Sequence, residues 1–292
     1  MKNLLDYSIT MSNDLARASQ GLSLVEKRII SLALSKINSR NADVEIARQQ
    51  GLTVEISAAS FADTFRVSPD TAYGYCKAAV NGLGNALADT GKEQFNWASG
   101  IDYRNGLLTL TFSPGVAAHL IGLKRTFISY RLKAVAELSS IYSWRLFECL
   151  TSWRLKNGWT AKIVDFYRAL DAEESYKKDY AALRRRIIQP AVDELQALYN
   201  QSLTYEPVRE GRKLTGIEFR YSKPSDTSKP QNDSEPKILV IGGSKASDSS
   251  VFDDEGQDVL TQLQQDRLAD LEAEEEYRQK FPEEFFDKND WR

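Results

Sequence analysis

The sequence predicts an α+β fold in which one layout, two helices followed by a β-hairpin, occurs twice in tandem. Three observations lead to this prediction. Apolar residues recur at helical spacing in several segments, Gly-containing turns separate β-rich runs, and the order of elements between Phe61 and Ser113 returns between Phe166 and Ser222. Residue identity between the two copies is low, so the argument depends on element order and spacing. Two unrelated α+β units are the alternative.

The first copy follows an N-terminal helix. Ser23 and Glu26 form a capping-box pattern, which predicts a helix over 23–37. The elements expected after it are a strand over 52–57, a short helix over 58–65, a turn over 66–70, a helix over 70–89 capped by Asp70, and a hairpin over 94–113. Asn105-Gly106 is the clearest turn signal of this hairpin. Helix, turn, helix and hairpin in this order predict a winged helix.

The second copy repeats the order. Its expected elements are a strand and helix start over 160–166 with the helix continuing to 172, a polar connection over 173–179, a helix over 180–198, and hairpin strands over 203–208 and 213–222. Segment 115–155 lies between the copies and contains two helical stretches. It also carries an aromatic cluster that we expect to pack one copy against the other: Phe127, Tyr130, Tyr142, Trp144, Phe147 and Trp153.

The packed pattern stops at Tyr221. Residues 222–237 are rich in Ser, Pro, Asp and Lys, which predicts a disordered linker, and residues 258–281 predict an acidic helix. We therefore expect winged-helix domains over 1–125 and 126–223, followed by a largely disordered linker and acidic tail over 224–292. We expect the tail either to dock a partner or to compete electrostatically for the basic middle of the chain, and a tail that only keeps the protein soluble is the alternative.

Charge is segregated along the chain, although the net charge is only −3. Residues 1–123 hold 11 Lys and Arg against 11 Asp and Glu, residues 124–223 hold 19 against 12, and residues 224–292 hold 8 against 18. The middle block thus has a surplus of +7 and the tail a deficit of −10. A basic block of this size predicts a polyanionic partner for the second copy.

The helix over 180–198 carries three consecutive arginines on an amphipathic pattern. The residues expected on its buried face are Leu183, Ile187, Ala191, Leu195 and Leu198. Arg185 and Arg186 project to the other side, with Lys178 and Gln189 near them on the same helical wheel. A packed helix with a cationic, hydrogen-bonding outer face suits insertion into a DNA major groove. A solvated basic face is the alternative interpretation.

Arg184 does not fit this pattern, because it falls near the middle of the apolar arc of the wheel. Either its side chain emerges at the helix start, or it pairs with a carboxylate such as Asp179 or Glu148. Pro190 removes a backbone hydrogen bond and is expected to disturb the helix there. The sequence does not separate base readers from phosphate anchors among the three arginines.

Several kinds of chemistry lack the residues they need. His119 is the single histidine and sits in an apolar run, so we expect it to be a hydrogen-bonded core or boundary residue rather than a catalyst. Cys76 and Cys149 lie in helix-like apolar segments and form neither a disulfide framework nor a zinc pattern. No phosphate-binding loop, signal peptide or membrane span is found. We expect a cytoplasmic protein without cofactor, metal or enzymatic activity.

The segments taken together resemble a known family. In chain order they are ASQGLSLVEKRIISLALSKI, SFADTFRVSPDTAYGYCKAAVNGL, GLLTLTFSPGVAAHLIGLKRTFISYRL, SSIYSWRLFECLTSW, YAALRRRIIQPAVDEL and YEPVREGRKLTGIEF. They resemble the plasmid replication initiators built from two winged-helix domains, the group that includes the F-plasmid initiator. The resemblance covers roughly residues 15–222, and Pro190 lies within it.

The resemblance implies a function. Such proteins bind double-stranded DNA: as monomers they bind direct repeats (iterons) at an origin, and as dimers they repress their own promoter through an inverted repeat. Their partners are the host replication initiator and helicase, which they recruit, and chaperones. The homodimer is in equilibrium with the monomer, and they use neither a nucleotide of their own nor a membrane. A winged-helix transcription regulator without origin function is one alternative. A nickase or primase is another, and the lack of a second histidine and of a nucleotide motif counts against it.

The resemblance also assigns residues to DNA contact. The basic cluster that matches Arg184, Arg185 and Arg186 makes the main base-specific contacts, while the first domain contributes weaker contacts and much of the dimer surface. Two further pairs are expected to contact DNA: Tyr73 and Lys77 on the second helix of the first copy, and Arg212 and Lys213 at the tip of the second hairpin. An exposed Lys over a half-buried Tyr, and a bare solvated turn, are the respective alternatives.

Overall fold

The computed structural model describes residues 4–37, 44–123, 126–153, 158–199 and 202–222. The predicted linker beyond Ser222 and the predicted acidic helix over 258–281 lie outside these residues.

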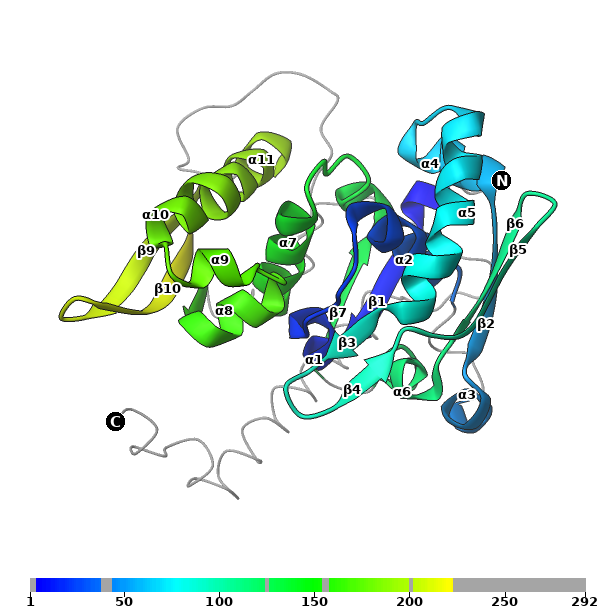
Figure 1. The fold of residues 1–292 in the computed structure, drawn as a ribbon, viewed down its shortest axis with the longest axis horizontal. Helices are drawn as coiled ribbons and strands as arrows, with labels where there is room; N and C mark the ends of the chain where they lie inside the picture. Colours follow the sequence, from blue (N-terminus) through cyan, green and yellow to red (C-terminus); the bar gives the residue numbers. More distant parts are fainter. Residues whose placement is uncertain (1–3, 38–43, 124–125, 154–157, 200–201, 223–292) are drawn as a thin grey trace, which may run out of the picture. The chain divides into compact units, whose positions relative to one another are not determined.

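Two three-stranded antiparallel sheets share one topology (Figure 1). Their strands are β2 (Leu52–Ser57), β5 (Ala98–Arg104), β6 (Leu107–Phe112), β8 (Gly158–Lys162), β9 (Ser202–Glu210) and β10 (Lys213–Ser222). The strand order is β2–β6–β5 in the first sheet and β8–β10–β9 in the second. In each sheet, the strand that precedes the helices pairs with the last strand of the hairpin. This is the topology of a winged helix, so the predicted tandem fold is confirmed.

Helices connect the first strand of each sheet to its hairpin. They are α4 (Ala58–Phe65) and α5 (Pro69–Asn85) in the first winged helix, and α8 (Ile163–Ala169), α9 (Glu174–Lys177), α10 (Tyr180–Leu183) and α11 (Gln189–Tyr199) in the second. A π-helical turn over Arg184–Ile188 joins α10 to α11 without a break. The polar connection predicted over 173–179 is therefore wrong in part, because its central residues form the short helix α9.

The helix predicted over 70–89 begins and ends earlier than expected. Ser68 caps it by accepting from the backbone N–H of Thr71 (3.2 Å), and Pro69 fills the first helical position, where no N–H is needed. The predicted cap, Asp70, instead lies in the first turn. The helix ends at Asn85, because the residues after it form strand β3 (Leu87–Asp89), paired with β4 (Gln94–Asn96).

The hairpin of the first winged helix has the predicted turn. Arg104 lies opposite Leu107, and the two residues between them have positive φ, 51° at Asn105 and 78° at Gly106. This is the conformation of a two-residue type I′ turn, which Asn-Gly adopts with little strain. The prediction of a hairpin centred on Asn105-Gly106 is confirmed.

The remaining elements surround the first winged helix and lead to the second. They are η1 (Leu4–Asp6), β1 (Ser8–Ser12), α1 (Asn13–Arg17), α2 (Leu24–Lys36), α3 (Val44–Gln50), α6 (Pro114–Ala117), β7 (Phe127–Arg131), η2 (Leu132–Ala134) and α7 (Ile141–Trp153). The capping box of α2 is confirmed, because the backbone N–H of Ser23 donates to Glu26 Oε2 (2.7 Å) and that of Glu26 donates to Ser23 Oγ (3.4 Å).

The described part of segment 115–155 contains one long helix, α7, besides the end of the short α6, where two helical stretches were expected. Residues Phe127–Arg131 form strand β7, which pairs antiparallel with β1 near the start of the chain. Burial alternates along β7, with Ile128 and Tyr130 inward and their neighbours more exposed. This period of two is that of a strand, and β1 supplies the hydrogen-bonding partner.

Helix α7 packs against both halves of the described chain. It contacts α1 before the first winged helix and α11 within the second, and its residues from Ser143 to Leu150 are buried. The ring of Phe147 stacks on Tyr199 of α11, with 5.5 Å between ring centroids. The expected packing role of the aromatic cluster is confirmed for Phe147, whereas Phe127 is 40% exposed.

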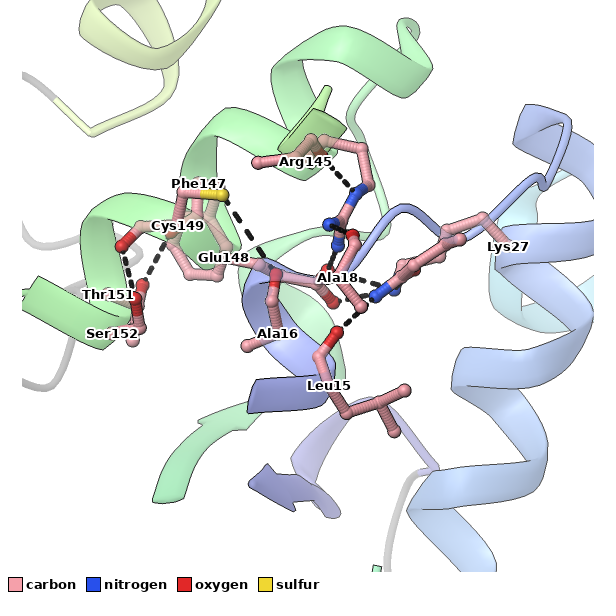
Figure 2. Close-up of polar contacts among 12 residues, drawn as sticks. Leu15, Ala16, Ala18, Lys27, Arg145, Phe147, Glu148, Cys149, Thr151 and Ser152 are labelled. Carbon is pink, nitrogen blue, oxygen red and sulfur yellow. Dashed lines mark hydrogen bonds and ion pairs between the residues drawn. The ribbon is translucent and has the colours of Figure 1, made fainter. Parts of the chain in front are cut away.

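Three fully buried ionisable side chains meet beside α7 (Figure 2). Lys27 Nζ of α2 lies 2.7 Å from Glu148 Oε1, and Arg145 Nη1 lies 2.5 Å from Glu148 Oε2. The hydroxyl of Tyr130 donates to Glu148 Oε1 (2.6 Å), and Lys27 also donates to Gln20 Oε1 (2.7 Å). Every charge in this group therefore has a partner, as buried charges require.

The charges in this group alter each other's pKa. Burial alone would raise the pKa of the Glu148 carboxyl, but Lys27 and Arg145 outweigh burial and hold this pKa below its ordinary value. Burial lowers the pKa of the Lys27 ammonium to about 8 despite the nearby carboxylate. At neutral pH the group is thus a carboxylate between two cations.

Arg145 also joins the two halves of the described chain. Its Nε donates to the carbonyl of Ala169 at the end of α8 (3.0 Å), and its Nη2 donates to the carbonyl of Ala18 after α1 (2.5 Å). Nearby, the Asp171 carboxylate accepts from the backbone N–H groups of Gln20 (2.9 Å) and Gly21 (3.2 Å). These bonds tie residues 18–21 to residues 169–171.

Residues expected to have no chemical role have ordinary surroundings. His119 is half-buried, its Nδ1 lies 2.7 Å from Ser12 Oγ, and burial lowers its pKa. Cys76 and Cys149 are both buried free thiols. Within the residues that the structure describes, no helix is long and apolar enough to cross a membrane.

Candidate nucleic-acid interface

The arginine-bearing helix of the second winged helix packs as its apolar pattern predicts. Leu183, Ile187, Ala191 and Leu195 are buried, and Leu198 is half-buried. This face covers the sheet through contacts between α11 and β9. The prediction of an inward apolar face is confirmed. Because this face packs on the sheet, the helix presents its outer side chains from a fixed position.

The arginine run lies in the π-helical turn, which changes the direction of its side chains. The backbone N–H of Gln189 bonds to the carbonyl of Arg184, five residues back, and Pro190 has no N–H to continue the α-helical pattern. Since a π turn holds more residues than an α turn, successive side chains are separated by a smaller angle. Arg184, Arg185 and Arg186 are consequently all exposed.

The α-helical wheel places Arg184 in the apolar arc, but its side chain is exposed, in agreement with the alternative in which it emerges from the helix. Neither of its proposed carboxylate partners contacts it. Asp179 caps α10 by accepting from the backbone N–H of Ala182 (3.0 Å), and Glu148 is bound by Lys27 and Arg145. The Nε of Arg184 instead donates to the hydroxyl of Tyr205 on β9 (3.3 Å).

Tyr205 was not found from the sequence. Its hydroxyl donates to Gln189 Oε1 (2.7 Å), and Gln189 Nε2 donates to Asp193 Oδ1 (2.8 Å). Both ends of the Gln189 carboxamide are thus engaged, and this side chain is half-buried rather than free. The alternation of β9 places Tyr205 toward the helix, which was the available signal.

Lys178 is exposed but does not belong to the same helix as the arginines. Helix α9 ends at Lys177, and the next helix begins after its N-cap, Asp179. The prediction that Lys178 lies beside Arg185 and Arg186 on one helical wheel is therefore wrong. The separate helix α9 breaks the periodicity that the wheel assumed.

The hairpin β9–β10 places further cations beside the start of this helix. Arg212 and Lys213 are exposed at its tip, next to Gly211, whose φ is 59°. Arg209 of β9 was not singled out from the sequence. Its guanidinium lies 5.4 Å from the ring centroid of Tyr180 and donates to the carbonyl of Arg212 (3.3 Å). Arg209 thus connects the wing to the first turn of the helix.

In the first winged helix, Tyr73 and Lys77 lie together on the exposed face of α5. They line a shallow groove between this helix and the β5–β6 hairpin, with Asn81, Asp102, Tyr103 and Asn105. The rings of Tyr73 and Tyr103 meet edge to face, 5.1 Å apart. The cation nearest the hairpin turn, Arg104, is paired with Asp102 (2.8 Å). This groove offers fewer free cations than the second winged helix.

Comparison with known proteins assigns each winged helix to a sequence family. Residues 8–151 match the family described as initiator replication protein, WH1. Residues 162–221 match the family described as initiator Rep protein, WH2. The two matches follow one another in chain order and together span both winged helices.

Two similar proteins cover most of the described chain. An uncharacterized 27.6 kDa protein of Escherichia coli is 24% identical over 210 residues, which are 67% of this chain and 88% of that protein. The crystal structure of Pi initiator protein in complex with iteron DNA has a TM-score of 0.60 and 22% identity, and the match covers 74% of this chain and 97% of that one. The second similarity is one of fold.

Proposed function

We propose, from the premise that this chain belongs to the plasmid replication initiators with two winged-helix domains, that it binds repeated sites in double-stranded DNA at a plasmid origin. The observation that carries this proposal is the exposure of Arg184, Arg185 and Arg186 on the helix that stands where a winged helix inserts into the major groove. An amphipathic helix with three adjacent outward cations can approach base edges and phosphates together.

The wing supports the same orientation of the DNA. Arg209, Arg212 and Lys213 lie on the hairpin beside the helix, so cations flank it on the wing side. A duplex in contact with the arginine run would present neighbouring phosphates to this hairpin. Lys178, exposed just before the helix, adds a cation at its N-terminal end.

The two winged helices are proposed to contribute unequally. The second lies in the block with a surplus of +7, whereas residues 1–123 carry equal numbers of positive and negative side chains. Since phosphate neutralisation dominates affinity, the second domain supplies most of the binding and base reading. Tyr73 and Lys77 of the first domain make auxiliary contacts, and the rest of that domain provides the dimer surface.

The regulatory part of the proposal follows the family pattern. The monomer binds origin direct repeats, and the dimer represses its own promoter at an inverted repeat. Dimer and monomer are in equilibrium, chaperones are among the partners, and the host replication initiator and helicase, recruited in the cytoplasm, open the duplex. The chain itself acts by binding and not as an enzyme.

Footprinting on the DNA that flanks the gene tests this proposal. Purified full-length protein should protect tandem direct repeats of about two helical turns each, spaced so that successive copies lie on one face of the duplex. Protection of a single inverted repeat, with no direct repeats, would identify a plain transcription regulator instead.

A strand-cleavage assay tests the non-enzymatic part. Supercoiled plasmid carrying the footprinted region is incubated with the protein and Mg²⁺ or Mn²⁺. We expect it to stay supercoiled, and a nick at one defined position that depends on the protein would show that the chain is a nuclease.

A further inference from the structure

The three exposed arginines of the second winged helix differ in how they are held. Arg184 donates through Nε to the hydroxyl of Tyr205 (3.3 Å), whereas Arg185 and Arg186 make no polar contact within the described residues. We propose, on the basis of the DNA-binding function above, that Arg184 reads a base and that Tyr205 is its positioning residue. Arg185 and Arg186 then bind phosphates.

Tyr205 can act as a positioning residue because its ring is fixed in the sheet. It lies directly opposite Phe219 in the β9–β10 pair, and the two ring centroids are 6.0 Å apart. Phe219 is fully buried and stacks on Phe166 and Trp159. The Tyr205 hydroxyl is thus carried by the aromatic core of the domain, and its place does not depend on DNA.

The hydroxyl takes part in a directed chain of hydrogen bonds. Arg184 Nε donates to Tyr205, Tyr205 donates to Gln189 Oε1 (2.7 Å), and Gln189 Nε2 donates to the Asp193 carboxylate (2.8 Å). Each group in the chain donates onward, and the chain ends on a negative charge. Such chains strengthen one another and resist rearrangement.

This chain uses one nitrogen of the Arg184 guanidinium. Its two terminal amino groups make no hydrogen bond or ion pair within the described residues and are left for a ligand. Two parallel N–H donors from an arginine match the N7 and O6 acceptors of guanine in the major groove. The side chain is therefore held at the nitrogen nearest its stem while its fork is available for DNA.

The unheld arginines suit a different task. A base contact needs a fixed geometry, and ordering a flexible arginine on binding costs conformational entropy that a side chain held in advance does not lose again. A phosphate contact tolerates several side-chain positions, because it is largely a matter of charge. Arg185 and Arg186, exposed and unheld, meet only the second requirement.

The test begins by selecting a tight-binding duplex from a random pool with the full-length wild-type protein. Each base pair of that duplex is then changed in turn, and affinities are measured for wild type and variants. We expect Arg184→Ala to lose discrimination at one G·C pair, by about tenfold to a hundredfold, with the other positions still discriminated. Arg185→Ala and Arg186→Ala should weaken all duplexes by a similar factor.

Tyr205→Phe isolates the hydroxyl, since the ring on Phe219 is kept. It should reduce discrimination at the same G·C pair as Arg184→Ala, by a smaller factor, and have no further effect when Arg184 is already alanine. Tyr167→Phe is the matched control, because it removes the hydroxyl of a half-buried tyrosine on α8 of the same domain that has no part in the proposed DNA contacts. We expect it to bind like wild type, and the melting temperatures of all these variants should agree.

The outcomes separate this inference from the function on which it depends. Failure of the wild-type protein to select any preferred duplex would contradict the proposed function. Selection of a duplex, followed by a uniform loss of affinity in Arg184→Ala, would overturn the inference alone. A Tyr205→Phe variant that discriminates at this G·C pair as well as wild type does would also overturn it. The same holds if Tyr205→Phe causes as large a loss of discrimination in the Arg184→Ala background as it does in wild type.

Discussion

The buried charge group beside α7 makes Glu148→Gln the most informative perturbation of the fold. Glu148 is fully buried and receives Lys27, Arg145 and the Tyr130 hydroxyl at 2.5–2.9 Å. Glutamine has nearly the same shape, so the substitution removes the charge and leaves the volume. Two buried cations would then face a neutral amide.

The expected cost is large because the remaining charges cannot reach water. Removing one partner of a buried ion pair costs about 3–5 kcal/mol, compared with a total stability of about 5–15 kcal/mol for a domain. For a folded region of roughly 200 residues this corresponds to a fall in melting temperature of about 6–20 °C. Arg145 also holds the carbonyls of Ala18 and Ala169, so the contact between the two halves of the described chain should loosen as well.

Urea denaturation of the full chain measures this, with fluorescence of the buried Trp97 and Trp144 as the signal. Glu137→Gln is the matched control, because Glu137 is 59% exposed and lies 3.5 Å from an exposed Arg66. We expect no measurable change for the control. If the free energy of unfolding of Glu148→Gln lies within about 1 kcal/mol of the wild-type value, Lys27 and Arg145 do not depend on the Glu148 carboxylate as partner, and the reasoning is refuted.

Four further outcomes are expected. The pKa of Glu148 is depressed in the folded state, so the stabilisation from its carboxylate is present above the ordinary pKa of 4.5 and is lost as pH falls through the lowered pKa. The free energy of unfolding should therefore fall less steeply with decreasing pH in Glu148→Gln than in wild type. Burial raises the thiol pKa of both Cys76 and Cys149 to about 11. A thiol reagent at pH 8 should therefore label neither cysteine before the protein unfolds. Rapid labelling of the native protein would contradict this burial. Lys77→Ala should weaken binding to every duplex alike and slightly reduce the salt dependence, whereas a base-specific loss would make Lys77 a reader. Deleting residues 224–292, which carry a net charge of −10, should leave DNA binding intact or tighten it, and loss of folding would show that the tail belongs to the core.

Local patterns in the sequence were sufficient for the elements that depend on local interactions. The capping box at Ser23 and Glu26, the Asn105-Gly106 turn and the apolar face of the arginine helix are each fixed by residues a few positions apart. Each of these features can be predicted from a single segment, because their causes are local: hydrogen-bonded helix ends, positive φ in the turn, and helical periodicity. The repeated order of such elements then led to the tandem winged helix.

Strand β7 and the contacts of Tyr205, which both depend on distant partners, were not predicted. Strand β7 forms because β1, whose Ser8 pairs with Arg131, supplies its hydrogen bonds from the start of the chain. Tyr205 reaches Arg184 and Gln189 because β9 packs on the helix, and the alternation of β9 gives only the face on which Tyr205 lies, not its partners. Long-range pairing of this kind overrides what local patterns alone predict, here two helical stretches within segment 115–155.

The arginine run shows how one local departure changes the predicted site. An ideal α-helical wheel places Arg184 inward, whereas the π-helical turn over Arg184–Ile188 leaves all three arginines outward. Pro190 was the visible sign of an irregular hydrogen-bonding pattern, but proline alone does not say which neighbouring residues shift. The π-helical turn, and not proline alone, makes Arg184 accessible and brings its Nε to the Tyr205 hydroxyl.

The central claim is that the arginine helix of the second winged helix is the main DNA-recognition element. In the most direct measurement, Arg184, Arg185 and Arg186 are all changed to alanine. The affinity of this variant is then measured for the selected duplex and for a duplex of scrambled sequence. A second variant with Lys36, Arg48 and Lys92 changed to alanine loses the same charge from exposed positions elsewhere and serves as the control. We predict that the first variant binds the two duplexes equally weakly while the control still prefers the selected duplex, and unchanged preference in the arginine variant would contradict the claim.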